Sequence, residues 1–313
     1  MKKAPLVLWM SGGPGCSSLL ASMMENGPCR VSRDPVTGSP QARSNPYAWN
    51  DRANMLWVDQ PAEVGFSYGD THNSSMSAHD QVASNMLAFL HRWEERFPDS
   101  HNGELYIFAE SFGGHYAPAV ARRYYDAQRD NLAPKNLVLK GVGVGNGLTN
   151  PKIQYRYAPE FAYKNTYGVK AVTEEVYEKM VAAVPFCLEK IDACNADGGS
   201  HAKCLEAFEY CNNELEVPYI ASGRNIYDVR TTVKNDDDMK CVGDFVNQMS
   251  VREALDAVNP THSNPTFQAC NTAVYLRFLD DWSREYESSI PAMLEGGVDI
   301  LIYAGDADFV CNW

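Results

Sequence analysis

Residues 105–121 read LYIFAESFGGHYAPAVA, and this stretch decides the fold. The apolar run over 105–108 predicts a short buried strand, and small residues over 117–121 predict a helix that packs closely against it. Between them, Ala-Glu-Ser-Phe-Gly places Ser111 at a sharp turn. This is a variant of the G-x-S-x-G nucleophile elbow, with Ala109 in place of the first glycine. We therefore expect a strand, a strained turn that exposes Ser111, and a helix.

The helix after Ser111 would direct its first N–H groups at the serine, where an oxyanion develops during acyl transfer. A five-residue match also arises by chance, so the alternative is an ordinary strand-to-helix turn that contains a serine. The strand–turn–helix pattern on both sides of Ser111 favours the elbow.

Three further segments share this character of an apolar strand followed by a loop. They are PLVLWMSGGPGCSS at 5–18, NMLWVDQPAEVGFSY at 54–68 and YAGDADFVCNW at 303–313. Together with 105–121, and in the same order, they resemble the signature blocks of the serine carboxypeptidases. The resemblance covers nearly the whole chain. It implies an enzyme that releases C-terminal amino acids from peptides through an acyl-enzyme on Ser111.

The resemblance implies an α/β-hydrolase fold, with a mostly parallel central sheet, helices on both faces and a disulfide-bearing lid insertion. The alternation of predicted strands and helices agrees, because parallel strands need helical crossovers. A chain of 313 residues is long enough for one such domain. We expect the first part of the core over 1–151, the lid over 152–245, where aromatic, acidic and cysteine residues crowd together, and the return of the core over 246–313.

Net charge and hydropathy exclude several classes of partner. The formal net charge of −13 argues against nucleic acid and against an anionic membrane surface. No apolar run approaches the length of a membrane span. We find no motif that calls for a cofactor or a metal. The resemblance implies peptide and protein substrates with a free C-terminus, and it leaves the oligomeric state open.

The glycine loop at 11–16, SGGPGC, is the second expected part of the catalytic machinery. An oxyanion needs two convergent N–H donors, and the resemblance assigns them to Gly13 and Phe112. A phosphate-binding loop is the alternative, but no Gly-Lys-Ser/Thr follows. The resemblance also assigns recognition of the substrate's terminal carboxylate to Trp9, Ser11, Gly12, Glu25 and Glu110. Many members of the family have asparagine at the position of Ser11, whose hydroxyl has a shorter reach.

Glu25 and Glu110 correspond to a pair of contacting acids in the family. Two carboxyls in contact share a proton, and the pKa of one of them rises. A protonated Glu110 could donate a hydrogen bond to the substrate's carboxylate, whereas an ionised one would repel it. We therefore expect activity to be favoured at acidic pH.

The triad acid is expected in the turn after the strand over 300–303, where α/β-hydrolases carry it. The resemblance assigns the role to Asp308, and Asp306 is the alternative. It also suggests that Trp282 lines the pocket for a substrate side chain. The triad histidine should follow the acid, but no histidine follows Asp308. His115 is a weak substitute, because its helix carries it away from Ser111. We expect the chain to be truncated at both ends, and nearly inactive if complete.

Nine cysteines indicate an oxidising compartment. The resemblance implies the disulfides Cys16–Cys270, Cys187–Cys211 and Cys194–Cys204, and a thiol at Cys311 beside the triad acid. From the residues alone, the four lid cysteines allow three connectivities or a zinc site, although their spacing is not that of paired C-x-x-C knuckles. A Cys29–Cys241 bond is a further suggestion. Delivery through the secretory pathway, to a lysosome or vacuole or outside the cell, would follow, and Asn73 lies in a glycosylation sequon.

Two local predictions and two rival functions remain. Residues 28–53 contain four prolines among polar residues and are predicted as loop, and residues 78–96 as an amphipathic helix. Some relatives with this fold transfer acyl groups to small acceptors, so an acyltransferase is one rival. A non-catalytic binding or protective protein that keeps the fold is the other.

Overall fold

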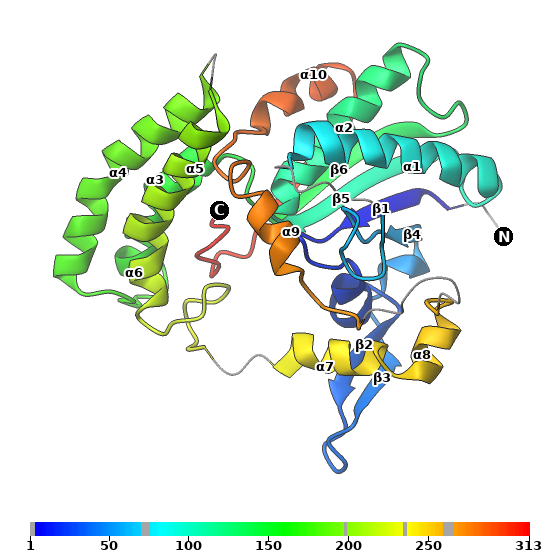
Figure 1. Cartoon of the computed structure of the whole chain (residues 1–313), viewed down its shortest axis with the longest axis horizontal. Coiled ribbons are helices and arrows are strands. Elements are labelled where there is room, and N and C mark those ends of the chain that lie inside the picture. The colour runs from blue at the N-terminus through cyan, green and yellow to red at the C-terminus, as the bar shows by residue number, and fades with distance from the viewer. Residues whose placement is uncertain (1–3, 70–75, 197–198, 234–236, 259–265) are drawn as a thin grey trace.

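A computed structural model describes residues 4–69, 76–196, 199–233, 237–258 and 266–313. Its centre is a five-stranded sheet in which every neighbouring pair is parallel. The strand order is β4 (Asn54–Trp57), β1 (Leu6–Met10), β5 (Glu104–Ser111), β6 (Val138–Gly147) and β7 (Asp299–Tyr303). The mostly parallel sheet expected from the sequence is confirmed, and Figure 1 shows it among helices.

Two long helices, which follow β4 and β5 in the chain, lie side by side over the sheet (Figure 1). A helical turn, η3 (Ala78–Val82), leads into α1 (Ala83–Arg96), so the helix expected over 78–96 is present. It buries Val82, Met86 and Leu90 as one stripe. Helix α2 (Gly113–Arg129) packs against β5 and β6. Since β1 is buried at all five positions, its continuous apolar sequence matches a strand covered on both faces.

The lid is a helical group beside the sheet, at the left of Figure 1. It contains α3 (Pro151–Lys164), α4 (Glu174–Asn195), α5 (His201–Cys211), the turn η4 (Asn212–Glu216) and α6 (Val217–Ile220). The disulfides Cys187–Cys211 and Cys194–Cys204 tie α4 to α5. They are the pairs that the resemblance implied, and because all four cysteines are bonded, none is a thiolate ligand for zinc. That the lid begins at residue 152 and ends at residue 245 stays a prediction.

The prediction of a loop over 28–53 was wrong in part. This region contains an antiparallel hairpin of β2 (Cys29–Arg33) and β3 (Pro40–Ser44). The prolines do not oppose it, because Pro40 takes the first position of its strand, where no ladder hydrogen bond is lost. Asp34 closes the turn by accepting from the N–H groups of Val36 at 2.9 Å and Thr37 at 2.8 Å.

The hairpin packs on α7 (Asp237–Val246), which lies below the sheet in Figure 1 and apart from the helices of the lid. Val31, Val242 and Val246 belong to this second apolar cluster. The suggested Cys29–Cys241 bond is not formed, because Cys29 keeps its thiol, with its sulfur 3.6 Å from Sδ of Met23. Packing of both cysteines in one cluster brings them to the same region without bonding them.

The return segment contributes α8 (Met249–Ala254), α9 (Thr272–Arg277), α10 (Ile290–Glu295) and β7. Cys270 is bonded to Cys16, which fastens this segment to the glycine loop after β1. At the edge of the sheet, Leu301 and Ile302 of β7 are 51% and 57% exposed. Asn73 lies outside the described residues. Among those that are described, no helix has both the length and the apolar character of a membrane span.

Candidate active site

Ser111 is the last residue of β5 and has a φ of 60°, a left-handed conformation that is strained for a non-glycine residue. The elbow has room only for small neighbours. A Cβ on Gly113 would lie 2.5 Å from Cβ of Ala109, so Ala109 and Gly113 share the space between strand and helix. Helix α2 begins at Gly113, so its N-terminal end lies at the turn.

The glycine loop lies directly against this elbow. A Cβ on Gly12 would come within 2.4 Å of the Phe112 nitrogen and 2.6 Å of the Glu110 oxygen, so only glycine permits the contact. Gly13 has a φ of +110°, which also requires glycine. The two residues expected to donate to an oxyanion, Gly13 and Phe112, therefore come from segments in contact beside Ser111.

Asp308 lies in the turn after β7 and is buried, whereas Asp306 is exposed and accepts a hydrogen bond from the Tyr167 hydroxyl. Burial raises the pKa of Asp308 to about 6. Three donors oppose this rise: the N–H groups of Cys311 at 3.3 Å and Val310 at 3.0 Å, and Nδ2 of Asn146 at 3.0 Å. The carboxylate is held as an orienting acid requires.

The two glutamates assigned to carboxylate recognition meet. Burial, then the charge of Glu110 and a hydrogen bond with it, raise the pKa of Glu25 to about 9. The pair therefore keeps a shared proton over the acidic and neutral range. The Trp9 indole donates to Oγ of Ser11 at 3.3 Å, and both side chains are buried next to the glycine loop.

Four of the expected site residues line one cleft of about 730 Å³, whose lining does not include Ser111 or the glycine loop. Trp9, Glu25, Glu110 and Asp308 line it together with Asn146, Asp306 and a wall of aromatic and arginine side chains. Three expected carboxylate-binding residues and the expected triad acid thus face the same space, which is large enough for a peptide end. No histidine among the described residues lines this cleft.

Cys311 stands between the acid and the nucleophile. Its thiol is buried, and burial together with the charge of Asp308 raises its pKa well above the usual value. A hydrogen bond with the Ser111 side chain opposes that rise. The thiol therefore keeps its proton beside Ser111.

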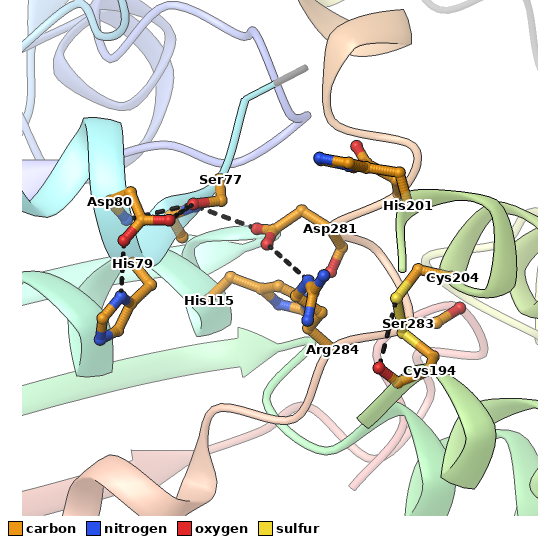
Figure 2. Close-up of polar contacts among 12 residues, drawn as sticks. Ser77, His79, Asp80, His115, Cys194, His201, Cys204, Asp281, Ser283 and Arg284 are labelled. Atoms are coloured by element: carbon orange, nitrogen blue, oxygen red, sulfur yellow. Dashed lines mark hydrogen bonds and ion pairs between the residues drawn. A yellow bond between two sulfur atoms is a disulfide. The ribbon is translucent and has the colours of Figure 1, made fainter. Parts of the chain in front are cut away.

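His115 does not reach Ser111. His115 belongs to α2, and its ring is fully buried. Nδ1 contacts the backbone carbonyl oxygen of Leu148, and Nε2 lies 3.1 Å from the backbone carbonyl oxygen of Asp281. Burial lowers its pKa to about 4, so it stays neutral. Figure 2 shows His115 beside Asp281 and Arg284, in a polar cluster that continues to Ser77 and His79. Through the contact with Asp281, His115 connects α2 to the return segment.

Trp282 lies next to the elbow, with its ring centroid 5.3 Å from that of Phe112. Its indole donates to the Tyr155 hydroxyl at 3.1 Å, and Tyr155 in turn hydrogen-bonds Glu216. Burial raises the pKa of Glu216 to about 7, and the bond from Tyr155 opposes the rise. Trp282 is not among the residues that line the cleft, so its role in a substrate pocket stays a prediction. The sequence analysis did not consider Tyr155 and Glu216.

Other cleft residues were also missed. Asn146, which orients Asp308, sits in the Gly-Asn-Gly turn at the end of β6, and that turn was the available signal. Asn26, Arg30, Tyr227 and Arg230 line the cleft, but nothing in their local sequence marks them. Among the described residues, no group of three or more His, Cys, Asp or Glu side chains could hold a metal ion.

Comparison with known proteins gives a consistent result. The chain is 36% identical over 315 residues to serine carboxypeptidase-like 48 of Arabidopsis thaliana, and 34% identical over 317 residues to carboxypeptidase Y of Komagataella phaffii. The matches cover 100% and 99% of this chain, which spans 59% and 57% of those relatives.

Among solved structures, the fold matches Kex1(delta)p, a prohormone-processing carboxypeptidase from Saccharomyces cerevisiae. The TM-score is 0.79 at 22% identity, over 99% of this chain and 67% of that one. The family model for serine carboxypeptidases matches residues 1–313. The chain therefore belongs to the serine carboxypeptidase family.

Proposed function

We propose that this protein is a serine-type carboxypeptidase that forms an acyl-enzyme on Ser111. The observation that carries the proposal is the contact of the strained Ser111 elbow with the glycine loop, next to the Glu25–Glu110 pair that lines the cleft. A serine nucleophile and an oxyanion hole serve any acyl transfer. The proton-sharing acids beside them favour a substrate that ends in a carboxylate.

In this mechanism Oγ of Ser111 attacks the last peptide carbonyl, and the N–H groups of Gly13 and Phe112 stabilise the oxyanion. The last amino acid leaves as the amine, and water then releases the acyl group. The family resemblance implies an imidazole, oriented by Asp308, as the base for both steps, and no histidine of the described residues lines the cleft to fill that place. Asn146 and the turn at 308–311 keep the Asp308 carboxylate in place for it.

The Glu25–Glu110 pair explains why acidic pH should favour binding. While the pair holds its proton, one carboxyl can donate a hydrogen bond to the substrate's terminal carboxylate. Loss of that proton at higher pH leaves both glutamates ionised, and their negative charges repel the substrate's terminal carboxylate. The Michaelis constant of the parent should therefore rise with pH, and Glu110→Gln should make it nearly independent of pH. An equally steep rise in the variant would contradict this role.

The direct test uses the protein as it occurs in its source, here called the parent, and measures release of leucine from benzyloxycarbonyl-Phe-Leu, with the α-amide of the same dipeptide as control. The parent should cleave the free acid and leave the amide. Ser111→Ala should lower the rate by at least about a thousandfold. Ser250→Ala, on the exposed surface of α8, should leave the rate unchanged.

The same preparation separates the rivals. Reaction of Ser111 with a fluorophosphonate without peptide cleavage, but with transfer of an acyl group to an added alcohol, would favour an acyltransferase. No reaction with the fluorophosphonate would favour a non-catalytic binding protein. The three disulfides support a place in the secretory pathway, because such bonds persist in oxidising compartments.

A further inference from the structure

Arg30 lies on β2, on the face that looks into the cleft. Burial along this strand alternates, with Val31 buried in the cluster with α7 and Arg30 exposed. Successive side chains of a strand point to opposite faces, so Arg30 points away from α7. It lines the same cleft as Trp9 and Glu25, two of the residues assigned to the substrate's terminal carboxylate.

Arg30 has no ionic partner in the part of the chain that the structure describes. Among the described residues, it forms no hydrogen bond or ion pair. The other arginine of the cleft, Arg230, differs, because its guanidinium binds both oxygens of Asp228 at 2.8 Å. Arg30 is therefore the cation of this cleft that remains available to a ligand.

The position of Arg30 in the hairpin is unfavourable for the stability of the hairpin. Arg30 is paired across the strands with Arg43, and like charges directly opposite each other destabilise a hairpin. Arg43 is exposed and does not line the cleft. A second donor lies near. Asn26 lines the cleft, its Oδ1 is fixed by the Trp57 indole at 2.9 Å, and its Nδ2 is buried without an acceptor among the described residues.

We propose that Arg30 determines specificity for the last residue of the substrate, and that it selects an acidic side chain, aspartate or glutamate. A guanidinium matches a carboxylate through paired hydrogen bonds, and it disfavours a lysine or arginine at the same place. This inference rests on the proposed function, because it takes the terminal carboxylate to be bound at Glu25 and Glu110. The side chain of the same residue then lies within the part of the cleft that Arg30 lines.

The test measures binding of three peptides to protein with Ser111→Ala, which prevents their hydrolysis. The peptides are benzyloxycarbonyl-Phe-Glu, benzyloxycarbonyl-Phe-Gln and the α-amide of the first. Trp9 and Trp49 line the cleft, so quenching of tryptophan fluorescence reports occupancy. At pH 6 the glutamate side chain is ionised. It should bind about fivefold more tightly than glutamine, as expected for one partly exposed ion pair, and the ratio should fall in high salt.

Arg30→Gln should bring the ratio of the two dissociation constants to about one by weakening only the glutamate peptide. Arg30→Lys should keep part of the preference. Arg43→Gln, the matched change across the hairpin, should keep all of it. A preference that survives in Arg30→Gln would overturn the inference. So would an equal loss for both peptides, which would mean that Arg30 binds the terminal carboxylate instead.

The α-amide distinguishes failure of this inference from failure of the proposed function. If glutamate and glutamine peptides bind equally well but both better than the amide, the carboxypeptidase site stands and the role of Arg30 falls. If the amide binds as tightly as the free acid, recognition of a free C-terminus fails, and the inference fails with it. The same conclusion follows if none of the three peptides binds.

Discussion

Two clusters of ionisable residues in this protein differ in what surrounds most of their acidic side chains. In the cleft, Glu25 meets Glu110, and Asp308 is buried among neutral donors. The other cluster lines a crevice of about 650 Å³ between the lid and the core. There three of the four lining acids pair with bases: Asp80 with His79 at 3.0 Å, Asp126 with Arg122 at 2.8 Å, and Asp280 with His201. Burial raises the pKa of the fourth, Glu285.

The difference shows that neighbours decide what an acid does. Burial and a like partner raise the pKa of Glu25 to about 9, whereas a hydrogen bond from His79 lowers the pKa of Asp80. An acid whose pKa is raised in the folded state binds its proton more tightly there than in the unfolded chain. Its stabilising contribution is complete below the unfolded pKa and is lost as pH rises to the folded pKa. Glu25 should therefore contribute strongly to the pH dependence of stability between pH 4.5 and 9.

The largest effect is expected for Glu25→Gln. In the parent, the free energy of unfolding should fall between pH 4.5 and 9, by at most about 1.4 kcal/mol per pH unit from this group. The variant should lose most of that slope in urea unfolding measured across the range. Glu175→Gln, an exposed helical glutamate paired with Lys179, is the control and should keep the parent's slope. Parallel curves for parent and Glu25→Gln would remove the basis of the comparison.

A smaller effect of the same sign is expected for Asp308→Asn. The pKa of Asp308 rises only from 3.8 to about 6, so its window is narrower than that of Glu25. The variant should flatten the stability curve between pH 4 and 6 and leave the slope of the curve unchanged above pH 7. Thermal unfolding in a series of buffers measures this. A change confined to alkaline pH would show that another group titrates.

The smallest effect is expected in the crevice. Arg122→Gln breaks an ion pair between helix positions four apart, with side chains 35% and 43% exposed. Such a pair contributes about 0.3–0.5 kcal/mol and is weakened by salt. Chemical unfolding at low and high ionic strength should show the loss shrinking with salt, and Asp126→Asn should match it. A loss above 2 kcal/mol would place this crevice on the same footing as the cleft.

The elbow and the core strands were predictable because their signals are local. Residues 105–121 contain a run of apolar residues, then a turn of small residues, then a segment with helical periodicity. The structure forms β5 and α2 there. The hairpin at 29–44 was not predictable in this way. Its prolines suggest loop, yet they occupy the turn and the first strand position, where proline does not interrupt pairing.

The residues of the candidate site also differ in whether a local sequence pattern marks them. Ser111 and the glycine loop carry local patterns, whereas the contact between Glu25 and Glu110 joins distant segments and was inferred only from the family resemblance. Arg30, Asn146 and Glu216 went unnoticed because each acquires its role from what the fold places beside it. A side chain's hydrogen-bond partner is a property of the packed structure, and sequence spacing does not encode it.

The edge strand β7 has a practical consequence for work on this polypeptide. Leu301, Ile302 and Tyr303 are exposed there, and the chain pairs only one side of the strand, with β6, among the described strands. An apolar strand with open backbone groups is a template for pairing with another molecule. Preparations of these 313 residues should therefore self-associate as concentration rises. Dilute samples and a charged substitution at Ile302 are the first measures for keeping them monodisperse.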